Sequence, residues 1–324
     1  LAKKLEVDAL TIGGDLYEDG RVSQDTARFL AEQLGDLPCP VLISPGNHDF
    51  WHRGSLYASN DWPTNVHVFE TSEFTPFEVS GYRVFGVAHQ KPKGTGNLLQ
   101  GVRVPDGLPA LALFHGSEQE GMPFQEEGKE DHAPFKRAEL EKSGFQFGLL
   151  GHFHTPRQTD QLVYPGNPEP LTFGEAGERG AVEIEFAGGT PKVTVHKVNT
   201  FTLSEIEVDV SQCQHSDALV RRLQEALPGG KDQGARVTLV GELALGIQIG
   251  PTELLRRLRE GDRCVELVYR TRPALDLEEL LSAKDVRGEF TRGLMARDDK
   301  NSDLVQQALR CGIEALRGEE PALL

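Results

Sequence analysis

Short apolar runs alternate with amphipathic stretches along the first part of the chain. Residues 7–12 and 40–44 are β-rich apolar runs, and residues 23–34 between them place apolar side chains at helical spacing. Further strand-like runs follow at residues 66–69, 82–88, 110–114 and 147–150. The alternation predicts layered α and β elements.

The pattern changes in the second part of the chain. Residues 163–198 are strand-like throughout, and from residue 199 onward strands and helices alternate in a small α+β module. A polar helix is expected over residues 302–316. We therefore predict three segments, at residues 1–198, 199–297 and 298–324.

Polar clusters directly follow four of the predicted strands. Asp15 follows the apolar run 7–12, and Asn47-His48-Asp49 follows the run 40–44. His115 follows the run 110–114, and His152 and His154 follow the run 147–150. Strand ends on one edge of a sheet converge in space, and glycines beside them permit tight turns. Oxygen and imidazole donors suit Mn²⁺, Fe or Zn²⁺ better than Ca²⁺.

Each cluster alone has a simpler explanation. An aspartate after a strand can cap a helix, and a single histidine such as His115 is more often packed than metal-bound. The ordered occurrence of all four clusters is the observation that favours a metal site. His89 and His132 are interpreted as residues without a ligand role, the second at the surface.

The ordered motifs resemble those of the calcineurin-like metallophosphoesterases. The matching segments are Gly14-Asp15, Gly46-Asn47-His48-Asp49, His115 and Gly151-His152-Phe153-His154. The flanking sequences, with Tyr164-Pro165-Gly166-Asn167, are similar to the SbcD/Mre11 branch of DNA-repair nuclease subunits. This resemblance implies an α/β fold, a four-layer α/β/β/α metallophosphoesterase sandwich with a smaller C-terminal α+β capping domain.

The resemblance also implies a role for each matching residue. Asp15 would bridge two divalent metal ions, Mn²⁺ above all, with Fe, Zn or Mg as alternatives. Asn47, His115 and His152 would complete one metal and His154 would bind the other. His48 would face the scissile phosphate as a catalytic residue, and Asp49 would orient it, as carboxylates often do for imidazoles.

One motif of the family has no counterpart here. The family's first motif, Asp-x-His, would precede Gly14-Asp15, where only a few residues stand. The sequence begins with Leu1, so we expect an N-terminally truncated chain. A degenerate enzyme that has lost one metal is the alternative.

The net charge of the chain bears on how such an enzyme would bind DNA. The 324 residues carry a formal net charge of -16, part of it in the Glu-rich segment 118–131, which we expect to be solvated. Affinity for nucleic acid rests on neutralised phosphates, so this balance argues against tight binding of DNA by the chain alone. The resemblance implies an SbcC/Rad50-like ATPase as a partner, and it allows a homodimer.

The compartment follows from two further features. The four cysteines show no Cys-x-x-Cys spacing, which favours free thiols in a reducing compartment. No apolar run approaches the roughly 20 residues that span a bilayer. We expect a cytoplasmic protein with no membrane association.

The leading functional hypothesis is a metal-dependent DNA exonuclease or endonuclease of double-strand break repair. A phosphoesterase for small substrates and an inactive scaffold are the alternatives. Trp51 and His52 could stack on a nucleobase, although for Trp51 we expect instead that it packs the loop against the core. Leu309 and Ile313 on the last helix either pack on this chain or, as we predict, attach the ATPase.

Overall fold

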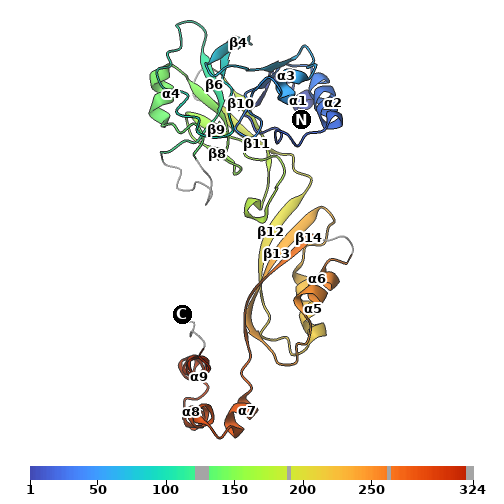
Figure 1. Ribbon diagram of the computed structural model, residues 1–324, viewed down its shortest axis with the longest axis vertical. Coiled ribbons are helices and arrows are strands. Elements are labelled where there is room, and N and C mark those ends of the chain that lie inside the picture. The colour runs from blue at the N-terminus through green and yellow to red at the C-terminus, as the bar shows by residue number, and fades with distance from the viewer. Residues whose placement is uncertain (121–130, 188–190, 261–263, 319–324) are drawn as a thin grey trace. The chain divides into compact units, whose positions relative to one another are not determined.

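The computed structural model describes residues 1–120, 131–187, 191–260 and 264–318, and it divides into two compact units, Leu1–Thr202 and Leu203–Leu324 (Figure 1). The second unit begins four residues after the predicted boundary at 199. Helices and strands alternate in both units, which confirms the predicted α/β class. Most of the Glu-rich segment lies outside the described residues, but Glu118 is buried and Arg137 lies 3.3 Å from its carboxylate.

The first unit contains two main sheets and a hairpin. A three-stranded sheet has the order β1-β2-β3, with all pairs parallel. A six-stranded sheet has the order β4-β5-β6-β7-β9-β8, and its central strands are parallel. The strands are β1 (Leu10–Ile12), β2 (Val41–Ile43), β3 (Val66–Val68), β4 (Thr75–Val79), β5 (Tyr82–Gly86), β6 (Ala110–His115), β7 (Phe147–Gly151), β8 (Arg157–Gln158) and β9 (Leu162–Tyr164), with the hairpin β10 (Gly180–Glu185) and β11 (Lys192–Lys197).

Side chains on the two faces of the six-stranded sheet enter different cores. On β6, Ala112 and Phe114 pack in one cluster with Leu140 of a helix, whereas Leu111 and Leu113 pack in another. This second cluster also contains Leu42 of β2, so it lies between the two sheets. The alternation follows from the period of two along a strand.

Helices cover the outer faces of this arrangement. The outer face of the three-stranded sheet packs against a cluster that includes Leu34 of α2 and Tyr57 of α3. The layers are therefore helix, sheet, sheet and helix, as the resemblance implied. The helices are α1 (Ala2–Leu5), α2 (Gln24–Gly35), α3 (Leu56–Ser59), α4 (Arg137–Ser143) and a 3-10 turn, η1 (Phe173–Glu175).

The second unit begins with a three-stranded sheet of order β12-β13-β14, in which β13 and β14 are parallel. Two helices cover one face through Leu223 and Leu258, which pack with Val237 of the sheet. The elements are β12 (Thr202–Asp209), α5 (Ser216–Ala226), β13 (Gln233–Leu243), α6 (Pro251–Leu258) and β14 (Cys264–Pro273).

The chain continues into three short helices that pack together, α7 (Leu277–Ser282), α8 (Val286–Met295) and α9 (Asp303–Leu316). Leu309 and Ile313 of α9 are 1% and 0% exposed, in a cluster with Leu280 and Phe290. The prediction that this pair attaches the ATPase is therefore wrong, and the alternative, packing on this chain, is confirmed. No helix among the described residues is both long and apolar enough to cross a bilayer.

Candidate functional site

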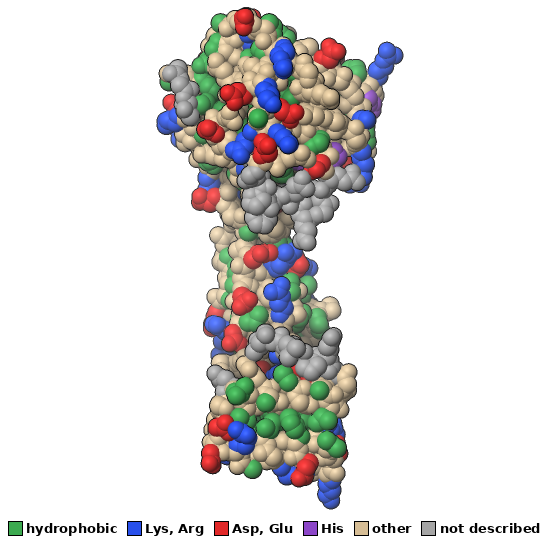
Figure 2. Space-filling view, turned by 90° about the vertical axis from the view of Figure 1, so that its left-hand side faces the viewer, with side chains coloured by type: hydrophobic (Ala, Val, Ile, Leu, Met, Phe, Trp, Pro, Cys, Tyr) green, Lys and Arg blue, Asp and Glu red, His purple; other side chains and the backbone are tan. Residues whose placement is uncertain are grey.

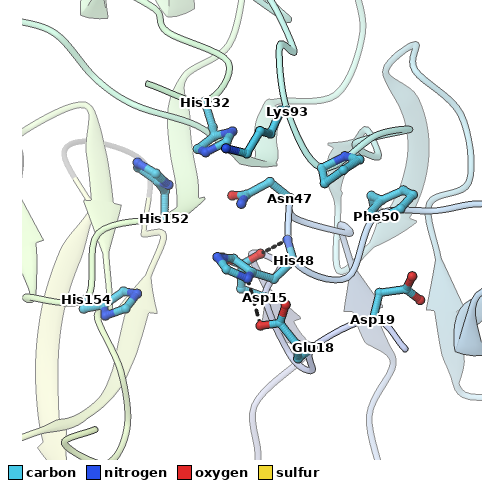
Figure 3. Close-up of a pocket in the computed structure, with 11 residues that line it drawn as sticks. Asp15, Glu18, Asp19, Asn47, His48, Phe50, Lys93, His132, His152 and His154 are labelled. Carbon is cyan, nitrogen blue, oxygen red and sulfur yellow. Dashed lines mark hydrogen bonds and ion pairs between the residues drawn. The ribbon is translucent and has the colours of Figure 1, made fainter. Parts of the chain in front are cut away.

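Five loops of the first unit, which follow β1, β2, β5, β6 and β7, meet at one pocket (Figure 3). Asp15 follows β1 and Asn47 follows β2, its parallel neighbour. His115 is the last residue of β6, and His152 comes directly after the parallel strand β7. The carboxyl ends of parallel strands lie at the same edge of a sheet, which explains why these residues come together.

Glycines allow the loops of the two sheets to touch through their backbones. A Cβ atom on Gly151 would lie 1.9 Å from the carbonyl oxygen of Gly13. A Cβ atom on Gly46 would lie 2.3 Å from a carboxylate oxygen of Asp15. Contacts this short exclude any side chain, so glycine at these positions joins the end of β1 to the ends of β2 and β7.

The backbone is strained at two of the predicted site residues. Asp15 has φ 56° and His152 has φ 121°, in the region that side-chain-bearing residues rarely adopt. Such conformations cost about 1–3 kcal/mol each and persist where the surroundings enforce them, often at functional sites. The strain therefore marks the two loops as shaped for the placement of these side chains.

Three polar side chains converge at the centre of the site. His115 Nε2 lies 3.2 Å from Asp15 Oδ2 and 3.3 Å from His152 Nδ1. The other ring nitrogen of His115, Nδ1, lies 2.9 Å from the carbonyl oxygen of Gly13 and donates to it. A neutral His115 ring then presents a lone pair at Nε2 to the Asp15 carboxylate. Two such acceptors at this distance require a proton or a cation between them.

Asn47 adds an oxygen to this group. Its side chain is 7% exposed, and Oδ1 has no hydrogen-bond partner among the described residues. A buried polar atom without a partner costs about 1–3 kcal/mol. An asparagine oxygen can ligate a metal without adding charge, so the orphaned atom fits a cation.

The site residues do not form a metal site by themselves. Within the described ranges, no three side chains of the His, Cys, Asp and Glu types are placed to hold one ion. A metal at this centre therefore needs further ligands, such as the Asn47 oxygen and water. The donor set of carboxylate, amide oxygen and imidazole fits Mn²⁺, Fe or Zn²⁺.

His48 lines the pocket with a partly exposed side chain. Its backbone N–H donates to Asp15 Oδ1 at 2.9 Å, which ties the loop after β2 to the loop after β1. Its ring is half exposed, and Nδ1 lies 2.9 Å from Glu18 Oε2 (Figure 3). The ring is thus oriented by a carboxylate, with Nε2 as its remaining polar atom.

Asp49 occupies a different place from the one expected. Its buried carboxylate accepts from the backbone N–H groups of Asp15, Leu16 and Gly46 and from the Tyr57 hydroxyl, at 2.6–3.0 Å. Burial and then the Asp15 carboxylate raise the pKa of Asp49, against the effect of these donors. Glu18 is the carboxylate at the His48 ring, and Asp49 instead holds the two loops in position.

His154 lines the pocket on the same side as His152, across from His48 and Glu18 (Figure 3). Its Nδ1 lies 2.6 Å from Oε1 of Glu175, a buried residue of η1. Burial raises the pKa of Glu175, but hydrogen bonds from Leu171 N–H, His154 and Asn167 outweigh it, so the pKa is lowered. A carboxylate behind a histidine is the arrangement typical of metal-binding imidazoles, whose other nitrogen faces the metal.

Sequence reasoning missed several residues at this site. Glu18 and Glu175 contact predicted residues 30 and 21 positions away, and Lys93 lines the pocket. His132 also lines the pocket and is 8% exposed, so its interpretation as a surface residue was wrong.

His89 has a structural role. The residue is fully buried, and its Nε2 donates to the His115 carbonyl at 2.8 Å. Burial lowers the pKa of His89 to about 4.

Comparisons with known proteins concern the same part of the chain. Residues 1–156, which contain every predicted site residue, match the family described as Calcineurin-like phosphoesterase. The chain is 25% identical to the uncharacterized metallophosphoesterase YhaO of Bacillus subtilis (strain 168) over 248 residues, 73% of this chain and 59% of YhaO. It is 26% identical to the DNA double-strand break repair protein Mre11 of Methanopyrus kandleri over 359 residues, 98% of this chain and 74% of that protein. The match to YhaO thus spans less than two thirds of that relative.

Proposed function

Because this chain carries a calcineurin-like metallophosphoesterase domain at residues 1–156, we propose that it hydrolyses phosphodiester bonds of DNA with the aid of two divalent metal ions, above all Mn²⁺. The observation that carries the proposal is the convergence of Asp15, His115 and His152 at a pocket that Asn47 also lines, where the buried Asn47 Oδ1 has no hydrogen-bond partner among the described residues. The family as a whole uses divalent metal ions. The number and identity of the ions belong to the proposal.

The residues of the site would supply ligands to two metal ions. Asp15, Asn47, His115 and His152, together with water, would hold one ion, and Asp15 and His154, whose ring contacts Glu175, would contribute ligands to the other. When bound, such ions neutralise phosphate charge and lower the pKa of water to near neutrality. His48, oriented by Glu18, presents Nε2 to the phosphate and donates a proton to the leaving oxygen.

DNA is the proposed substrate for two reasons. A relative that aligns with 98% of the chain is named a DNA double-strand break repair protein. The chain also carries a second compact unit after the phosphoesterase domain, as expected for a capping domain that positions a large substrate. The proposed compartment is the cytoplasm, which the four free cysteines support.

The test compares three substrates with one preparation of the metal-loaded chain. We expect Mn²⁺-dependent release of nucleotides from end-labelled linear duplex or single-stranded DNA, and no release after chelation. Cleavage of p-nitrophenyl phosphate without cleavage of DNA would favour the small-substrate alternative. No hydrolysis of any of the three by the Mn²⁺-loaded chain would favour the scaffold. Either of these results would overturn the proposal.

The proposed partner is an SbcC/Rad50-like ATPase that supplies a DNA-holding surface. The net charge of -16 opposes tight DNA binding by the chain alone, and basic and acidic side chains are interspersed on the face of the first unit drawn in Figure 2. Two apolar side chains of the C-terminal helices, Val286 and Leu304, are 69% and 75% exposed. Exposed apolar residues on short helices suit docking onto another helical protein.

We expect the double substitution Val286→Asp and Leu304→Asp to reduce co-purification with that ATPase about tenfold or more, because both side chains face solvent in the free chain. The variant should unfold at the same temperature as the wild type. Leu309→Asp is the matched comparison, since Leu309 is buried and its replacement should destabilise the helices themselves. Undiminished co-purification of the double variant would contradict this attachment surface.

A further inference from the structure

Phe50 is an aromatic residue that lines the pocket. Its ring lines the same cavity of about 560 Å³ as Asp15, Asn47 and His48 (Figure 3). Phe50 packs in none of the hydrophobic clusters formed by the described residues. Most aromatic residues bury a large apolar area in a core or interface, so this position calls for another explanation.

The backbone on both sides of Phe50 is held firmly. Asp49, before it, is fully buried and accepts four hydrogen bonds. Trp51, after it, donates its backbone N–H to the His89 carbonyl at 2.8 Å, and its side chain packs against the cluster around Tyr57. Phe50 is therefore presented to the pocket by a rigid segment.

A second ring supports Phe50. The centroids of Phe50 and His52 are 4.9 Å apart with an angle of 30° between the planes, and His52 Nε2 lies 3.2 Å from Asp19. We call this pair the aromatic ledge. The packing of Trp51 confirms the expectation that this residue belongs to the core, and it leaves the ledge as the stacking surface beside the site.

We propose that the aromatic ledge stacks on the base of the nucleotide whose phosphate lies at the group of Asp15, Asn47 and His115. This inference rests on the proposed function and names the substrate class more closely: nucleotide esters with an unpaired base. Every base has a π-face, so a stacking platform of this kind tolerates any sequence. A substrate with no ring attached to its phosphate would gain nothing from the ledge.

The test uses two diesters with the same leaving group, the p-nitrophenyl ester of thymidine 5′-monophosphate and methyl p-nitrophenyl phosphate. The measured quantity is the ratio of kcat/KM for the thymidine ester to kcat/KM for the methyl ester. Stacking contributes about 1–3 kcal/mol per base, so Phe50→Ala should lower this ratio roughly 5- to 150-fold. Phe50→Leu, which keeps an apolar side chain without a ring, should lower it by a similar factor.

Two further variants complete the design. Phe50→Trp should retain the wild-type ratio or raise it, because a larger ring stacks at least as well. Phe29→Ala is the matched control, since Phe29 lies on α2 and is 58% exposed, and it should leave the ratio unchanged. A ratio that stays within about threefold of the wild type in both Phe50→Ala and Phe50→Leu would overturn the ledge.

The experiments distinguish failure of the stacking proposal from failure of the proposed function. If neither DNA nor either ester is hydrolysed, the proposed function fails, and the ledge is still tested by calorimetric binding of thymidine 5′-monophosphate and inorganic phosphate. Phe50→Ala should then weaken binding of the nucleotide roughly 5- to 150-fold more than binding of phosphate. Equal weakening of both would overturn the ledge.

Discussion

Replacing Asp15 by asparagine is expected to remove bound metal and to lower metal-dependent hydrolysis at least about 10³-fold, since stabilisation by the ions amounts to several kcal/mol. Asp15 is the point where two loops meet: Oδ1 accepts from the His48 backbone and Oδ2 lies 3.2 Å from His115. Asparagine is the cleaner substitution because it tolerates the left-handed backbone that Asp15 adopts, at φ 56°. Alanine would add backbone strain to the loss of charge.

Metal content after dialysis and kcat/KM should fall together in this variant. Thermal unfolding without metal provides the control, because a similar melting temperature shows that the fold survives. A variant that retains the wild-type metal content would remove Asp15 from the ligand set, and one that also retains wild-type turnover would place the reaction elsewhere.

Replacing His48 by alanine is expected to lower the turnover of DNA about 10²- to 10⁴-fold while the metal content stays unchanged. The ring is half exposed and its Nδ1 contacts Glu18, and the ring takes no part in the contact between His115 and Asp15. The side chain is therefore placed to act on the substrate and does not contribute to the central group.

A comparison of leaving groups separates acid catalysis from other roles of His48. A p-nitrophenolate leaves without protonation, so the deficit of His48→Ala should be much smaller for a p-nitrophenyl diester than for DNA. Loss of metal from the variant, or an equal deficit for both substrates, would contradict the assignment of His48 as the proton donor.

The sequence predicted the position of the site better than its internal contacts. Residues that follow apolar strands, such as Asp15 and His115, were recognisable because strand ends converge and short motifs mark them. Glu18 and Glu175 carry no such mark. Their contacts with His48 and His154 arise from tertiary packing between segments 21 to 30 residues apart, which no local pattern encodes.

Neighbouring aromatic residues show the same limit. Phe50 and Trp51 are adjacent, yet Trp51 packs in a core cluster and Phe50 lines the pocket. Composition and spacing cannot predict which of the two rings enters the core. The hydrogen bonds that Asp49 and the His89 carbonyl make with this loop determine the direction of each ring.

The last helix shows that an apolar stripe predicts a helix but not the surface against which the helix packs. The apolar stripe of α9 correctly predicted an amphipathic helix, since a stripe at helical spacing must be buried. What buries it is a matter of tertiary structure: Leu309 and Ile313 pack against Leu280 and Phe290 of this chain. Leu304, on the same helix, is 75% exposed, and the burial of this position was not decided by the stripe alone.

The most direct test of the central claim is the position of the metal itself. Crystals of the chain grown with Mn²⁺ and measured at the manganese absorption edge should show an anomalous peak within coordination distance of Asp15, of the Asn47 side-chain oxygen and of His115 Nε2. The same peak should be missing in Asp15→Asn. A chain that hydrolyses DNA in Mn²⁺ but shows no peak at these atoms, or shows its peak elsewhere, would contradict the account.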